Sequence, residues 1–256
     1  MKDAIEKHVT AYNLRILAFI MMIINHAGTH IFSYGSFAYI TQVFITRGAF
    51  IIFCYFAADG MVHTRNRIKY LGRILLTALI SEAIYDLFFY GSVPYWGGQN
   101  VCFTLFIGGL AIYLNDLCKE KISNNTLCAL LQLLITALSI HISSACFLDY
   151  GFVGPILIFE FYYLREHKLL MMICAALSFP ALWGLQVCRF YVYRNNPNIS
   201  FALFLANLKV ELPGALVLPL LYCYSGKQGK KMSRWLTYGF YPMHLCILYL
   251  ILKVVL

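Results

Sequence analysis

The chain has 256 residues, of which 61% are hydrophobic and only 12% are charged, and its formal net charge is +9. A soluble domain averages about 45–50% apolar and about 25% charged residues, so this chain has too few polar residues to cover a water-soluble fold. The composition excludes a cytosolic enzyme, a disordered tail and a nucleic-acid-binding protein, despite the positive charge. It predicts an all-α protein, a polytopic transmembrane helix bundle that forms a single integral membrane domain over residues 1–256.

Apolar segments follow one another along the whole chain. A helix needs about 20 apolar residues to cross the hydrocarbon core of a bilayer. We expect nine spans, at 14–34, 40–62, 73–91, 101–117, 126–147, 150–165, 169–189, 203–224 and 235–254. The segment 150–165 is short, and 203–224 contains Lys209, Glu211 and Pro213, so eight or ten spans remain alternatives. Pro213 also predicts irregular backbone in that segment.

Basic residues alternate between successive loops, which indicates an orientation, because short cytoplasmic loops collect Lys and Arg. With Lys2 and Lys7 inside, the inner loops hold most basic residues, and Arg194 and Lys253 are the exceptions. The outer loops without a basic residue are 35–39, 92–100 and 148–149. The pattern predicts the N-terminus inside and the C-terminus outside, so the excess charge is first an orientation signal.

Nine cysteines are dispersed through the spans without a C-x-x-C pair. A disulfide framework or a zinc site needs clustered spacing, so we expect neither, and no metal. This cysteine usage fits a multi-pass protein of a bacterial plasma (inner) membrane.

Ionisable side chains inside the bilayer are the first candidates for function, because their burial is costly. His26 and His30 lie one helical turn apart on one face of the first span, in the segment INHAGTHIF. His26 can act as a general base or can be a hydrogen-bonded interhelical histidine. Asn25 precedes it, and His30 lies nearer the lipid headgroups.

Further polar residues are predicted at the same depth, in the outer half of the membrane. Arg47 could pair with Glu82 or Asp86, as a structural link or as part of a site. The other candidates at this level are Asn100, Asp149, Tyr150 and His244, which we expect, with His30, to bind substrate.

One inner loop, HTRNRIKYLGR, is unusually basic. It contains His63, Arg65, Arg67, Tyr70 and Arg73. The orientation signal alone explains its charge. However, guanidinium groups at alternate positions also suit bidentate contacts to phosphates. The alternative interpretation of the loop is a binding site for a cytosolic cofactor that carries a nucleotide.

Several stretches resemble the TraX family, named for the conjugal-transfer protein that acetylates the N-terminus of pilin. They are LRILAFIMMIINHAGTHIF, FAADGMVHTRNRIKYLGRILLTALISEAIYDLFFYGSVPYWGGQNVCFTLFIGGLAIY, LDYGFVGPILIFEFYYLRE, ALVLPLLYCYSGKQGKK and FYPMHLCILYLIL. The resemblance implies acetyl transfer from cytosolic acetyl-CoA, with His26 as the intramembrane histidine and Arg65, Arg67 and Arg73 as the basic loop. Glu82, Asp86, Asn100 and His244 also match positions of the family pattern. The family usually has Asp where this chain has Asn25.

The expected mechanism has His26 deprotonating the acceptor or transiently carrying the acetyl group, while Arg47 or Asn100 stabilises the oxyanion. Asn25, Glu82 and Asp86 complete the predicted catalytic group. The partners expected are the lipid bilayer, acetyl-CoA and an acceptor such as a pilin N-terminus or a surface glycan. A proton-coupled transporter or flippase and a non-catalytic membrane scaffold are the alternatives.

Overall fold

The structure is a computed structural model that describes residues 9–33, 35–194 and 199–255. Lys2 and Lys7, on which the predicted orientation partly depends, lie outside these residues. All named secondary-structure elements in the described part of the chain are helical. They are α2 (Ala11–Ile31), α3 (Phe37–Thr46), α4 (Gly48–His63), α5 (Arg67–Tyr90), α6 (Val101–Lys121), α7 (Asn125–Ala145), α8 (Val153–Tyr163), α9 (Lys168–Tyr193), α10 (Phe201–Glu211), the 3-10 helix η1 (Leu212–Val217), α11 (Leu218–Tyr222) and α12 (Arg234–Val255). The expected all-helical class is confirmed.

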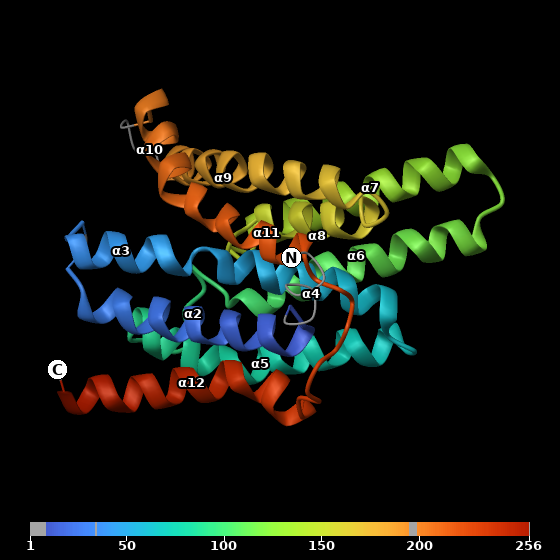
Figure 1. The fold of residues 1–256 in the computed structure, drawn as a ribbon. Coiled ribbons are helices and arrows are strands. Elements are labelled where there is room, and N and C mark those ends of the chain that lie inside the picture. The colour runs from blue at the N-terminus through green and yellow to red at the C-terminus, as the bar shows by residue number, and fades with distance from the viewer. Residues whose placement is uncertain (1–8, 34, 195–198, 256) are drawn as a thin grey trace. The chain divides into compact units, whose positions relative to one another are not determined.

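The helices form two compact units. Unit 1 comprises residues 1–53 and 166–256, and unit 2 comprises residues 54–165. In unit 1, α2 packs against α3 and α12, while α9 packs against α10, η1 and α11. In unit 2, α6 packs against α5, α7 and α8, and α6 and α7 form a helical hairpin (green in Figure 1).

Among the residues that the structure describes, seven segments are long and apolar enough to cross a membrane. They are Ala11–Ile31, Phe37–His63, Val101–Lys121, Asn125–Ala145, Lys168–Tyr193, Phe201–Tyr222 and Arg234–Val254. The protein is therefore a multi-pass membrane protein, as its composition predicts, but the expected count of nine spans is not confirmed.

Two predicted spans account for the difference. The segment 150–165 contains only the 11 residues of α8, which extend about 16 Å at 1.5 Å per residue, against about 30 Å of hydrocarbon. The segment 73–91 lies almost entirely in α5, which has 24 residues, and this segment contains three charged side chains, Arg73, Glu82 and Asp86.

Two other predicted spans are interrupted helices, and both interruptions lie in unit 1. The segment 40–62 breaks at Arg47, between α3 and α4, and 203–224 breaks after Glu211, where η1 begins. Proline lacks the N–H that an α-helix needs, so Pro213 ends α10 and confirms the irregular backbone expected there. A Cβ at Gly48 would overlap the side chain of Val217, so only glycine lets the two breaks approach this closely.

Candidate functional site

Two histidines meet in unit 1. Nδ1 of His26, on α2, lies 2.8 Å from Nε2 of His244, on α12, although 218 positions separate them in the chain. Nδ1 of His244 lies 3.0 Å from the backbone oxygen of Phe240, and His244 is buried. Two linked imidazoles among apolar helices can take up and pass on a proton. The predicted substrate residue His244 therefore contacts the predicted base His26 directly.

Asn25 holds α2 against α3 and is not bonded to the neighbouring imidazole. Its Nδ2 donates to Oγ1 of Thr46 at 2.9 Å, and its backbone oxygen accepts from Nε2 of Gln42 at 3.3 Å. The close approach depends on Gly28, where a Cβ would lie 2.6 Å from Cγ of Gln42. Asn25 thus joins two helices, and its side-chain bond to Thr46 serves helix packing.

The break between α3 and α4 places Arg47 against the break between α10 and η1. Nε of Arg47 lies 3.0 Å from Oε1 of Glu211, whose side chain is 0% exposed. The carboxylate that the structure pairs with Arg47 is therefore Glu211, which was not among the predicted partners. Glu211 was visible in the sequence as an intramembrane charge beside a proline, but sequence spacing could not reveal which helix it faces.

In unit 2, Asn100 organises the polar residues at the start of α6. It caps the helix, because its Oδ1 accepts from the backbone N–H of Cys102 at 3.0 Å. Its Nδ2 donates to the backbone oxygen of Ala78 at 2.8 Å and to Oε2 of Glu82, and its backbone N–H donates to the same oxygen at 3.2 Å. Asn100 is 0% exposed, so its side chain is fully committed to holding α6 on α5.

We expect Asn100→Ala to lower the free energy of unfolding by about 2–4 kcal/mol, because it removes a helix cap and leaves buried groups without hydrogen bonds. Thermal unfolding of the purified protein in detergent measures this. Asn124 caps α7 in the same way but is exposed, so Asn124→Ala is the matched control with an expected loss of about 1 kcal/mol. Equal losses in the two variants would contradict the organising role of Asn100.

Two other acidic residues of unit 2, Asp86 and Asp149, contact the segments on either side of this cap. Oδ2 of Asp86 accepts from the backbone N–H of Tyr95 at 2.8 Å, and the backbone oxygen of Asp149 accepts from Oγ1 of Thr104 at 2.5 Å. Oδ1 of Asp86 and Oε1 of Glu82 are buried and accept no hydrogen bond from the described residues. Buried oxygens of this kind can receive a donor group from a ligand.

Tyr150 has a left-handed backbone, with φ of 61°. A non-glycine residue held in this region is strained and is often found at a functional site. That Tyr150 and Asp149 bind substrate stays a prediction.

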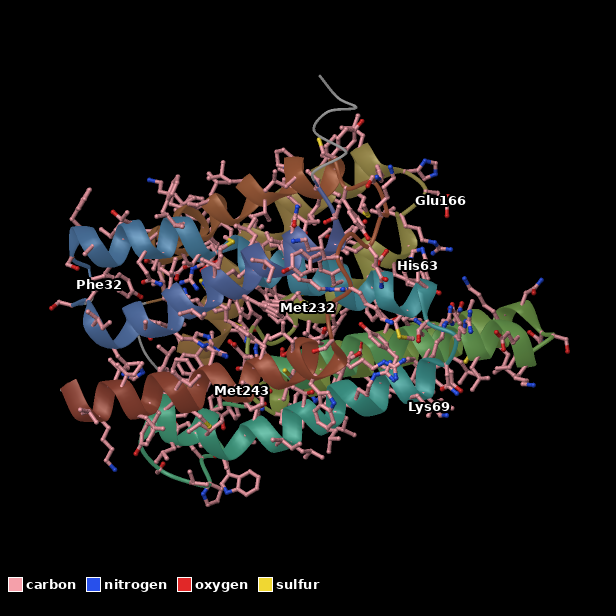
Figure 2. The ribbon with its side chains drawn as sticks, turned by 60° about the horizontal axis from the view of Figure 1, so that its bottom comes forward. Phe32, His63, Lys69, Glu166, Met232 and Met243 are labelled. Atoms are coloured by element: carbon pink, nitrogen blue, oxygen red, sulfur yellow. The ribbon has the colours of Figure 1, made fainter. Side chains whose placement is uncertain are left out.

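The basic segment predicted to bind a cofactor connects α4 to α5 in unit 2. Figure 2 shows His63 at the end of α4 and Lys69 at the start of α5, at the same end of this unit. Nδ1 of His63 lies 3.2 Å from Oδ1 of Asp59. Oη of Tyr70 donates to the backbone oxygen of Phe56 at 3.2 Å, so Tyr70 joins α5 to α4, and the Arg73 guanidinium lies 6.0 Å from its ring centre.

A cleft of about 600 Å³ opens beside this segment. Its lining residues are Thr64, Arg65, Asn66, Arg67, Ile68, Tyr113, Asp116, Lys119 and Glu120. It contains the N-terminus of α5, where backbone N–H groups and the helix dipole favour anions. Lys119, at the end of α6, therefore joins Arg65 as a candidate for phosphate binding.

Arg67 lines the cleft and links α5 to three other helices, α4, α6 and α8. Its Nη1 lies 2.7 Å from Oδ2 of Asp116 on α6, its Nη2 donates to Oη of Tyr162 on α8 at 3.2 Å, and its Nε donates to the backbone oxygen of Met61 at 2.9 Å. Oη of Tyr162 also donates to Asp116. Burial lowers the pKa of Arg67, but the bonds and charges of Asp116 and Tyr162 outweigh it and raise the pKa above its ordinary value.

The predicted site residues thus fall into two groups. Unit 1 contains Asn25, His26, His30, Arg47 and His244, and unit 2 contains His63, Arg65, Arg67, Tyr70, Arg73, Glu82, Asp86, Asn100, Asp149 and Tyr150. His30 lies one turn beyond His26 and is exposed, as expected for an interfacial residue. The sequence missed the contacts that Gln42, Asp116, Tyr162 and Glu211 make, because each depends on a distant helix.

Apolar helices that enclose polar clusters, with a basic cleft in unit 2, define a polytopic membrane protein with buried polar groups suited to binding or proton transfer. The chain belongs to the TraX family, since the family profile described as TraX protein matches residues 11–252. The resemblance seen in the sequence is confirmed.

A curated relative agrees with this assignment. The probable fimbrial assembly protein FimC, serogroup H1, of Dichelobacter nodosus is 26% identical over 257 residues, which cover 93% of this chain and 94% of the relative. No solved structure matches the chain.

Proposed function

We propose that this protein is a membrane-embedded acetyltransferase of a bacterial inner membrane, which moves an acetyl group from cytosolic acetyl-CoA to an acceptor at the outer side. The contact between His26 and His244 carries the proposal, because it places a potential general base among apolar helices. The TraX family is named for a pilin-acetylating protein, and the relative's description concerns fimbrial assembly. Both favour a pilin N-terminus as the acceptor over a surface glycan.

The transfer needs a base and a stabilised oxyanion. The imidazole of His26 takes a proton from the acceptor's amine or hydroxyl, whose nitrogen or oxygen forms a bond to the thioester carbonyl carbon. The carbon–sulfur bond then breaks, and the proton passes from His26 to the CoA thiolate. Arg47 can donate to the oxyanion, whereas the side chain of Asn100 is already used in capping α6.

The cleft in unit 2 is the proposed site for the phosphates of acetyl-CoA. Arg65 and Lys119 supply positive charge there, and the N-terminus of α5 adds backbone N–H groups. Arginine, lysine and helix N-termini are common phosphate ligands. Arg67, which is paired with Asp116, shapes the cleft and keeps the local charge near balance.

Labelled acetyl-CoA tests the proposal directly. Purified protein in proteoliposomes should transfer label to a peptide with a free pilin-like N-terminus, and an N-terminally blocked peptide should take up none. His26→Ala should reduce the rate by about 10²–10⁴-fold, the usual contribution of a general base. His141→Ala, an exposed histidine of α7, is the control, and normal transfer by His26→Ala would refute the role of His26.

A proton-coupled transporter is the second candidate, because two interrupted helices of unit 1 meet at the Arg47–Glu211 pair. Discontinuous helices with charges at their breaks are common in transporters. Proton-dependent uptake into proteoliposomes without acetyl-CoA would favour this candidate.

A further inference from the structure

The two hydrogen bonds of His244 together determine where its proton lies. The backbone oxygen of Phe240 can only accept, so Nδ1 of His244, 3.0 Å away, must carry a hydrogen. In a neutral imidazole only one nitrogen carries hydrogen. Nε2 of His244 is therefore an acceptor.

The same reasoning extends to His26. The 2.8 Å contact joins Nδ1 of His26 to the accepting Nε2 of His244, so Nδ1 of His26 must donate. A neutral His26 then holds its lone pair on Nε2. One main-chain oxygen on α12 thus sets the tautomer of a side chain on α2.

The surrounding rings hold this arrangement in place. The rings of His26 and His244 stack with centroids 5.0 Å apart, and Phe240 stacks on His244 at 5.1 Å. Phe240 also stacks on Phe19 of α2 at 3.9 Å, and the ring of Tyr241 meets His26 edge-on at 6.3 Å. Aromatic stacking of this kind fixes ring orientation between helices.

We propose that His244 is the positioning residue of the site: it fixes His26 with Nε2 as the proton-accepting nitrogen. This inference rests on the proposed acetyl transfer. It replaces the expectation that His244 contacts substrate. It also gives the site an orienting group. Asn25, which stands where the family usually has Asp, donates its amide hydrogen to Thr46 instead.

Proton movements in the pair balance. When Nε2 of His26 takes the acceptor's proton, the hydrogen on Nδ1 can pass to Nε2 of His244. The positive charge then lies on the His244 imidazolium, whose Nδ1–H still donates to the Phe240 oxygen. In orienting the base, His244 resembles the aspartate of a catalytic triad, but it differs in accepting the proton, since that aspartate stays unprotonated.

Nitrogen NMR of the reconstituted protein tests the tautomer without any turnover. Protein with ¹⁵N-labelled histidine should show His26, assigned by its loss in His26→Gln, protonated on Nδ1 and unprotonated on Nε2. In His244→Ala this preference should disappear. Because glutamine offers a carbonyl oxygen as an acceptor, His244→Gln should keep the preference. An Nε2-protonated His26 in the wild type, or an unchanged tautomer in His244→Ala, would overturn the inference.

Kinetics distinguish positioning from substrate contact. His244→Ala should lower kcat by about 100-fold or more with little change in either KM, and His244→Gln should restore part of kcat. Cys246→Ala, an exposed neighbour on α12, should match the wild type. A raised KM with kcat unchanged would contradict positioning. If neither the wild type nor any variant transfers acetyl groups, the proposed function is wrong. The NMR experiment still tests whether His244 fixes the tautomer of His26.

Discussion

Replacing Glu211 by glutamine is expected to lower the free energy of unfolding by about 3–5 kcal/mol, the usual cost of breaking a buried ion pair. Glu211 is fully buried, and its Oε1 lies 3.0 Å from Nε of Arg47, whose side chain is 18% exposed. Thermal unfolding in detergent or lipid nanodiscs should show a much lower midpoint. Lys209 lies on the same helix but is exposed, so Lys209→Gln should leave the midpoint nearly unchanged.

A double variant separates the loss of the pair from general damage to α10. Arg47→Met combined with Glu211→Leu replaces both charges with apolar side chains, which is often neutral or stabilising. We expect it to unfold at a higher temperature than Glu211→Gln. Equal midpoints for Glu211→Gln and Lys209→Gln would show that the ion pair contributes little.

The second large effect concerns the basic cleft. Arg65→Ala should weaken acetyl-CoA binding by about 10- to 100-fold, because a charge-assisted hydrogen bond contributes about 1.5–3 kcal/mol, and should leave thermal stability unchanged. Arg67→Ala should weaken binding and also lower the unfolding midpoint, since Arg67 bonds to Asp116 and Tyr162. Titration calorimetry and thermal unfolding on the same samples measure both quantities.

Lys69→Ala provides the control for net charge. Lys69 belongs to the same basic segment but does not line the cleft, so its removal should change acetyl-CoA affinity by less than twofold or threefold at physiological salt. If Lys69→Ala and Arg65→Ala weaken binding equally, the segment acts through its overall charge, as an orientation signal would, and the cleft is not the site.

The two groups of polar residues are expected to serve separate steps of the reaction. The histidine pair in unit 1 and the cleft in unit 2 can be perturbed separately, because no residue is shared between them. Variants of His26 should affect transfer with acetyl-CoA binding intact, whereas Arg65→Ala should affect binding first. If the His26 variants and Arg65→Ala both changed only the transfer rate, or both changed only acetyl-CoA binding, the protein would not be an acetyltransferase with separate donor and base sites.

The membrane class was predictable because composition alone decides whether a fold can be covered by polar residues. The 61% hydrophobic and 12% charged content indicated a membrane protein, and the seven apolar helices agree. The break at Pro213 was also predictable, since proline acts on its own helix. The span count was not, because hydropathy does not show that α8 is only 11 residues long.

The partners inside the protein could not be predicted in the same way. Local spacing places His26 and His30 on one helix face, but it says nothing about a residue 218 positions away. For the same reason the sequence predicts Glu82 or Asp86 as the ion-pair partner of Arg47, whereas the structure pairs Arg47 with Glu211. The sequence predicts that Asn100 binds substrate. Only its contacts show that it caps α6 and donates its backbone N–H to Glu82.

The sequence by itself therefore determined that this is a helical membrane protein of the TraX family and which polar side chains its helices carry. Both follow from local chemistry, because hydropathy, helix breakers and motif residues act within one segment. Only the tertiary structure decided that His244 contacts His26, that Glu211 pairs with Arg47 and that Arg67 braces the cleft. Those contacts depend on how helices pack against each other, and side-chain packing between distant segments leaves no periodic trace in the chain.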